Sequence, residues 1–168
     1  EPMFEYGPDG SNESGSNYGN RLEAWIEITP PPGLPDLDAV FFCCSDDPNE
    51  TFLSTNDDPG NALLIAQEPT WANARTWTGD PNTSRDPDGD GGMNNRSDEF
   101  YDNQYPNAGI PNQILLVPGQ KHYLYAVHTE GTGGDNLGVN LSEFGLDPID
   151  GDPPLGPDNA YIASIGIY

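Results

Sequence analysis

Turn-forming residues divide this chain into short apolar segments, and this feature limits the possible folds more than any other. Glycine supplies 20 and proline 18 of the 168 residues, and no stretch keeps the 3.6-residue periodicity of an amphipathic helix. In residues 22–29, apolar side chains instead alternate with mostly polar ones until a Pro-Pro-Pro-Gly run stops the pattern. A period of two residues predicts a strand with one buried face.

Further apolar runs of strand length follow along the chain. We predict strands at residues 22–29, 40–44, 51–54, 62–66, 113–117, 122–128, 137–141 and 161–168. The run at 40–44 is apolar on both faces, which favours a central position. Short strands separated by turn signals predict an all-β fold, an antiparallel β-sandwich with long acidic loops.

The length and local composition suggest how the chain is divided. A chain of 168 residues suits one domain with one core. Residues 1–16 are rich in Gly, Ser, Asn and acids, and we interpret them as an extended N-terminal arm outside the core. Residues 17–168 form the single domain, and residues 79–112 form an acidic insert with almost no apolar pattern.

The charge of the chain excludes some classes of partner. It has 28 acidic and 5 basic residues, a formal net charge of -23. Nucleic-acid binding requires cationic surface, so no nucleic-acid partner is expected. Anionic membranes are disfavoured for the same reason, and no apolar run is long enough to insert into a bilayer. Such a charge repels itself unless cations are bound or the salt concentration is high.

Several features favour a secreted, extracellular or cell-surface glycoprotein. The chain opens without an initiator Met, which we interpret as a mature, processed chain. It contains five Asn-x-Ser/Thr glycosylation motifs, at Asn12, Asn49, Asn82, Asn95 and Asn140.

The two cysteines, Cys43 and Cys44, are adjacent. They can close a strained disulfide with each other. Alternatively, one thiol faces the core and the other pairs with a second chain, because strand neighbours point to opposite faces. Two buried free thiols are the third alternative. The CxxC spacing of zinc sites is absent.

Two acidic loops that are remote in sequence suggest a metal site. The apolar run at 40–44 leads directly into Asp46 and Asp47, and a strand ending near residue 128 leads through a glycine-rich loop to Asp135 and Asn136. We expect the two loops to meet and hold Ca²⁺, because hard cations take oxygen ligands from carboxylates, carbonyls and Asn side chains. The alternative is that Asp-Asp-Pro only forms a turn.

The acidic insert contains a second candidate metal loop. Asp86, Asp88 and Asp90 alternate around glycines, as carboxylates do in looped calcium sites. The downstream Glu and flanking helices of an EF-hand are absent. The alternative is a solvated acidic loop.

The order and spacing of several short segments resemble a known family. Asn-Tyr-Gly-Asn-Arg-Leu at 17–22 begins the match, and Phe-Cys-Cys-Ser-Asp-Asp at 42–47 continues it with Phe-Leu-Ser-Thr-Asn-Asp-Asp-Pro at 52–59. Pro-Gly-Gln-Lys-His-Tyr at 118–123 and the stretch 128–137 complete it. Across residues 17–140, the chain resembles the PA14 domain in the version common in extracellular proteins of aquatic bacteria.

This resemblance implies a β-sandwich of the kind found in adhesins, flocculin-type lectins, glycosidases and toxins. In the lectins of the family, two consecutive aspartates joined by a cis peptide bind Ca²⁺, and the ion binds two vicinal sugar hydroxyls. The matching residues here are Asp46 and Asp47. The second calcium loop of those lectins matches Gly133, through its carbonyl, with Asp135 and Asn136. The insert at 79–112, the cysteine pair and Pro48 depart from the family pattern.

Two functions fit these features. The first is a lectin-like, Ca²⁺-dependent carbohydrate-binding and cell-adhesion module that binds glycans or a glycoprotein surface, with Trp or Tyr rings stacking on the sugar. The second is a structural subunit of an extracellular fibre or coat, which self-associates when the N-terminal arm adds a strand to a neighbour. We do not expect an enzyme. His122 and His128 share one strand face and are interpreted as packing residues, and no nucleophile elbow or HExxH motif is present.

Overall fold

The computed structural model describes residues 5–6, 17–29, 32–33, 36–79, 85–87, 89–106, 112–131, 136–154 and 165–167. The strands among these residues are β1 (Glu5–Tyr6), β2 (Tyr18–Ile28), β3 (Leu37–Asp46), β4 (Asn49–Ser54), β5 (Ala62–Glu68), β6 (Ile114–Leu116), β7 (Lys121–Glu130), β8 (Asn136–Glu143) and β9 (Ile165–Ile167). A single 3₁₀ turn, η1 (Pro59–Asn61), joins β4 to β5.

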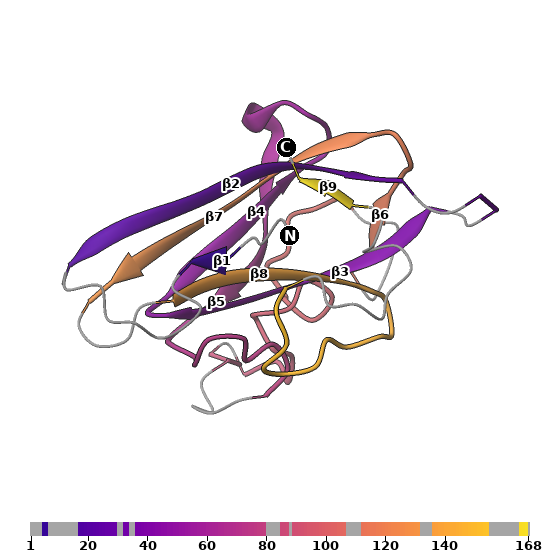
Figure 1. The fold of residues 1–168 in the computed structure, drawn as a ribbon. Coiled ribbons are helices and arrows are strands. Elements are labelled where there is room, and N and C mark those ends of the chain that lie inside the picture. The colour runs from indigo at the N-terminus through magenta and orange to yellow at the C-terminus, as the bar shows by residue number, and fades with distance from the viewer. Residues whose placement is uncertain are drawn as a thin grey trace.

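The strands form two antiparallel sheets that pack face to face (Figure 1). One sheet has the order β1-β8-β3-β6, and the other has the order β5-β4-β7-β2-β9. The predicted all-β sandwich is confirmed. No α-helix occurs in the described ranges, and no helix there is long and apolar enough to span a membrane.

Each predicted strand region contains a strand, but the ends differ. β2 and β7 pair continuously from Tyr18 opposite Glu130 to Glu27 opposite Lys121, so both run further than their apolar residues. The short strand β1 was not predicted. It lies within the expected arm and pairs with β8 of its own chain, with Glu5 opposite Gly138.

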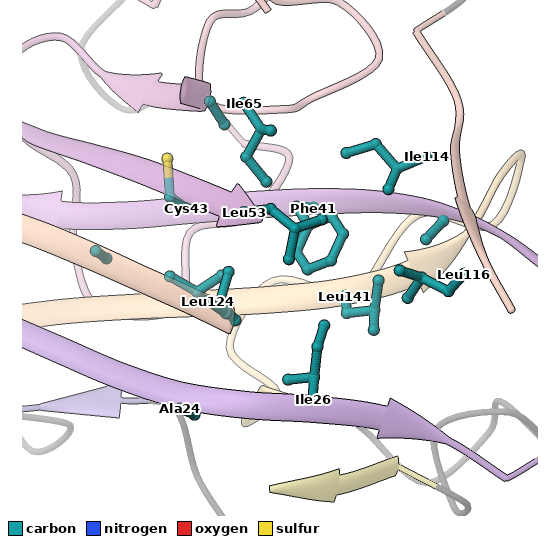
Figure 2. Packing of buried hydrophobic residues seen from close by; sticks show 14 of the residues in the cluster. Ala24, Ile26, Phe41, Cys43, Leu53, Ile65, Ile114, Leu116, Leu124 and Leu141 are labelled. Carbon is teal, nitrogen blue, oxygen red and sulfur yellow. The ribbon is translucent and has the colours of Figure 1, made fainter. Parts of the chain in front are cut away.

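The main core lies between the two sheets (Figure 2). It consists of inward-facing side chains from both sheets, which are nearly all fully buried: Ala24, Ile26, Ile28, Leu37, Ala39, Phe41, Cys43, Leu53, Ile65, Ala66, Ile114, Leu116, Leu124, Ala126, Leu137, Val139 and Leu141. Removing such surface from water contributes about 25 cal/mol for each Å², and this burial is the main force that holds the sheets together.

The strand β3 is buried on both faces, which explains its continuous apolar run. Phe41 and Cys43 point into the main core. Val40, Phe42 and Cys44 point the other way and join Ala72 and Trp77 in a second cluster, against which Phe144 packs. The central position predicted for this run is confirmed, since β8 and β6 flank β3.

The two cysteines therefore lie in different clusters. Both are free thiols, and they are 0% and 1% exposed for Cys43 and Cys44. Of the three alternatives for this pair, the structure has two buried thiols that form no disulfide. Their side chains point to opposite faces of β3, and neither reaches the surface. Burial raises the pKa of the Cys43 thiol, which keeps it protonated and unreactive.

Part of the acidic insert closes the exposed edge of β3. The strand β6 pairs only with residues 37–39, and beyond it the backbone amide of Ser97 donates to Phe41 O at 2.9 Å. The amide of Cys43 donates to Asn95 O at 2.8 Å, and the amide of Ala72 donates to Ser45 O at 2.6 Å. An unpaired edge would be a template for aggregation, so these segments protect the sheet.

The same insert joins β3 to the edge strand of the other sheet. The amide of Gln67 on β5 donates to Asn94 O at 2.8 Å, and the amide of Gln104 donates to Leu64 O at 2.8 Å. Phe100 of the insert is 2% exposed, and Asn95 is fully buried. Residues 94–100 are therefore packed against the side of the sandwich, whereas Asp86, Gly89, Asp90 and Gly91 are exposed.

His122 gives the fold a pH-dependent contribution to stability. The ring is 3% exposed, Nδ1–H donates to Ser54 O at 2.9 Å, and the buried Nε2 has no hydrogen-bond partner in the part of the chain that the structure describes. Burial lowers the pKa of His122 below its ordinary value of 6.5. The unfolded chain therefore binds the proton more readily, so this contribution is present above pH 6.5 and is lost as the pH falls toward the lowered pKa.

We expect His122→Gln to weaken the dependence of stability on pH. Urea unfolding of both proteins at pH 7, 6 and 5 should show a smaller loss in the variant, and the difference is at most about 1.4 kcal/mol per pH unit for one proton. Other titrating groups are common to both proteins and cancel in the comparison. Parallel stability curves would contradict this role.

Candidate functional site

The described ends of the two acidic segments lie close together. Asp46 ends β3 and lies directly opposite Asn136, the first residue of β8. The backbone amide of Gly131, just beyond β7, donates to Asp47 Oδ2 at 2.6 Å. Asp46 and Asp47 therefore lie at the same end of the sandwich as Gly131 and Asn136.

The Asp46–Asp47 peptide bond is cis, the geometry that the family resemblance implied for its calcium-binding pair. Both aspartates are partly exposed. The carbonyl of the following Pro48 accepts the amide of Thr129 at 3.1 Å, which ties this turn to β7.

Asn136 contributes a buried oxygen to this end of the sandwich. Its side chain is 6% exposed, and Nδ2 donates to Ala72 O at 3.1 Å. Its Oδ1 is buried and has no hydrogen-bond partner within the described part of the chain. Leaving such an acceptor unsatisfied costs about 1–3 kcal/mol, so a bound cation or donor at this oxygen stabilises the site.

Two further residues support the site and were not predicted. His128 is 2% exposed, and its Nε2–H donates to Asp46 O at 2.7 Å. Glu130, which is 4% exposed, places Oε2 3.8 Å from the same nitrogen. The interpretation of His128 as only a packing residue missed this contact. Its position two residues before an inward-facing acid was the available signal.

Trp71 lies beside the same end of the sandwich. It forms an isolated antiparallel bridge with Asp46, and 40% of its surface is exposed. The next residue, Ala72, accepts the Asn136 amide described above. An exposed ring next to the acidic pair provides an apolar surface that can stack on a sugar.

Gly133 and Asp135, which complete the predicted ligand set, lie outside the described residues. Within the described ranges, no group of three or more His, Cys, Asp or Glu side chains is placed to hold a metal ion. The described oxygen donors at this end, from Asp46, Asp47 and Asn136, are of the type that Ca²⁺ takes.

The second candidate loop uses its carboxylates differently. Asp86 accepts the amides of Gly89 and Gly91, at 2.8 and 3.1 Å, and Asp90 accepts the amide of Gly92 at 2.8 Å. Asp88 lies outside the described residues. The described aspartates thus fold their own turn.

Three of the five predicted glycosylation sites are buried. Asn49, Asn95 and Asn140 are 2%, 0% and 3% exposed. The side-chain Nδ2 of Asn49 donates to Ser45 Oγ, and the side-chain Nδ2 of Asn95 donates to two backbone carbonyls. A glycan does not fit at these positions, because each side chain is enclosed by the fold. Asn12 and Asn82 lie outside the described residues.

A scan of protein-family models, a search of curated proteins and a search of solved structures found no match to this chain.

Proposed function

We propose that this protein is an extracellular, Ca²⁺-dependent carbohydrate-binding module that serves in adhesion. The observation that carries the proposal is that Asp46, Asp47 and Asn136 lie together at one end of the sandwich, and that the buried Asn136 Oδ1 has no hydrogen-bond partner among the described residues. The resemblance to PA14 lectins supports the same conclusion, as does a net charge of -23 that favours bound cations.

The chemistry of the donors fits this role. Ca²⁺ takes six to eight oxygen ligands, and carboxylates with an Asn oxygen are hard donors of the right type. Asp46, Asp47 and Asn136 would hold the ion together with Asp135 and the carbonyl of Gly133. A bound ion that still accepts ligands from solvent can take two sugar hydroxyls, and Trp71 supplies an adjacent apolar surface.

The first test is calcium binding by isothermal titration calorimetry, with Asp47→Asn as the variant. The wild type should bind Ca²⁺ and gain about 2.7 kcal/mol of stability when the free ion is at 100 times its Kd. Asp47→Asn should lose most of this gain, because the neutral amide replaces a charged ligand. An equal gain in both proteins would exclude Asp47 as a ligand.

A second variant separates geometry from charge. A Cβ added at Gly131 would lie 2.7 Å from Asp47 Oδ2, so Gly131→Ala forces the carboxylate to move while every charge is kept. We expect weaker calcium binding in this variant too. Glycan-array binding in calcium, repeated with chelator, then tests the sugar: retention after chelation would overturn the proposed mechanism.

A structural subunit of a fibre or coat is the second candidate, and β1 is the observation that favours it. Only two residues of β1 pair with the edge of β8, and the same pairing supplied by a neighbouring chain would exchange the strand between copies. Sedimentation over a hundredfold range of concentration tests this candidate. Multimers that disappear when residues 1–16 are deleted would support it, and a monomer throughout would exclude it.

A further inference from the structure

A row of aromatic rings crosses the outer face of the five-stranded sheet, away from the acidic site. Trp25 on β2 contacts Tyr123 on β7, with ring centroids 5.0 Å apart. Tyr123 contacts Tyr125 at 5.8 Å, and Tyr125 stacks on Phe52 of β4 at 4.5 Å with the planes 8° apart. The solvent face of an antiparallel sheet is usually polar, so four rings in contact on this face are unexpected.

No other described layer lies over this face. The described residues 69–79 and 144–154 lie on the side of β3 and β8 (Figure 1), and Asn94 and Gln104 bond to the edge strand β5. On the five-stranded sheet, Trp25, Phe52 and Tyr125 are each partly exposed. The rings thus form an aromatic surface, defined by Trp25, Phe52, Tyr123 and Tyr125, in which Tyr123 is the buried member at 3% exposure.

The aromatic surface already binds one guanidinium, that of Arg21. Its Cζ lies 4.4 Å from the Tyr125 centroid, and Nη2 donates to Tyr123 Oη at 2.8 Å. The guanidinium also lies 3.1 Å from Glu23 Oε2, which accepts Tyr123 Oη–H at 2.5 Å. Rings and a carboxylate together form a cradle that suits a planar cation.

Acidic groups outnumber basic ones around the rest of the aromatic surface, where Glu27 and the exposed Lys121 opposite it also point to this side. Glu50 lies on β4 two residues before Phe52, and both side chains point to the same side of the sheet. At the other end, Trp25 Nε1 donates to the carbonyl of Asp57, whose residue is exposed. An aromatic centre with an acidic border is complementary to a partner that presents cationic side chains.

We propose that the aromatic surface docks a basic protein segment, whose Arg and Lys side chains stack on the rings and pair with the surrounding carboxylates. Aromatic residues are the usual anchors of protein interfaces, and a charged border adds specificity and speeds association. The net charge of -23 excludes an anionic partner. This surface lies on a different sheet face from the Asp46–Asp47 loop, so its binding is independent of calcium.

A tetra-arginine peptide is the probe, titrated at 150 mM salt into protein labelled with ¹⁵N and followed by NMR. The indole N–H of Trp25 and the amides of β2 and β7 around the rings should shift, while the Trp71 indole should not. Trp25→Leu should weaken binding about five-fold, the factor given by a cation–π contact of about 1 kcal/mol. Trp25→Tyr should retain most of the affinity because it keeps a ring.

Two controls make the result decisive. Trp71→Leu removes an exposed Trp elsewhere at the same net charge and should leave binding of the peptide unchanged. Cellopentaose, a neutral sugar chain, should not shift the Trp25 indole. Equal affinity of Trp25→Leu and wild type would overturn the proposal, since only general charge attraction would remain. Trp25 shifts caused by cellopentaose but not by the peptide would overturn it in favour of a second sugar surface.

Discussion

Arg85→Met is expected to lower the free energy of unfolding by about 3–5 kcal/mol, because it leaves a buried carboxylate without its cation. Arg85 and Glu68 have side chains that are 2% and 0% exposed, and Arg85 Nε lies 2.8 Å from Glu68 Oε2. The other nitrogens of the guanidinium donate to the carbonyls of Gly79 and Thr76. One side chain thus connects β5 to both ends of the turn at 76–79.

A double-mutant cycle identifies the source of this loss. If the unpaired charge is responsible, Glu68→Gln combined with Arg85→Met should be less destabilised than Arg85→Met alone, because no buried charge remains. Arg21→Met is the matched control. Its ion pair with Glu23 has side chains that are 49% and 53% exposed, so its loss should be about 1 kcal/mol or less.

Urea unfolding at pH 7 measures all five proteins: the wild type, Arg85→Met, Glu68→Gln, the combined variant and Arg21→Met. A loss below about 1 kcal/mol for Arg85→Met would show that the insert does not depend on this ion pair. A loss of similar size in Arg21→Met would show that burial is not the deciding factor.

The strands could be predicted from sequence because their signal is local. The alternation in residues 22–29 identifies β2, and the two-sided apolar run at 40–44 identifies a strand that is covered on both faces. What covers the second face of β3 could not be predicted. The covering residues Ala72, Trp77 and Phe144 come from separate segments without a period.

The role of the insert was also hidden, for a physical reason. Asn95 and Ser97 are polar and look like loop residues, but they are fully buried and satisfy backbone groups of β3. Hydrogen bonds to a sheet edge have no hydrophobic pattern, so composition alone suggests solvent exposure. The glycosylation motifs predicted modification of buried Asn residues for a related reason, because a motif of three residues carries no information about burial.

The candidate site was predictable in part. The first loop follows β3 and the second leads into β8. These two strands prove to be neighbours, and register places Asp46 opposite Asn136. The contribution of Gly131 could not be foreseen, because it is a backbone amide that donates to Asp47. The support from His128 depends on a carbonyl 82 residues away in the chain.

The two tryptophans that follow β5 also show that burial could not be predicted from sequence. Substituting one of them gives the second large effect that we expect. Trp71 and Trp77 lie only six residues apart in the sequence, yet they are 40% and 0% exposed. Trp77 packs its ring tip against the backbone of Gly138, and its Nε1 donates to Asp152 O at 2.9 Å. Trp77→Ala should therefore cost about 3–5 kcal/mol, from lost burial and the cavity left between the insert and β8.

Trp71→Ala is the matched variant and should cost about 1 kcal/mol or less, because much of its ring is already in water. Urea unfolding in chelator, where calcium makes no contribution, measures both losses directly. Glycan binding in calcium should show the reverse order. Trp71→Ala should bind the glycan more weakly than Trp77→Phe, provided that Trp77→Phe folds. Equal destabilisation by the two alanines would mean that the second cluster on β3 is not a packed core. The position of Trp71 beside Asp46 would then need another explanation.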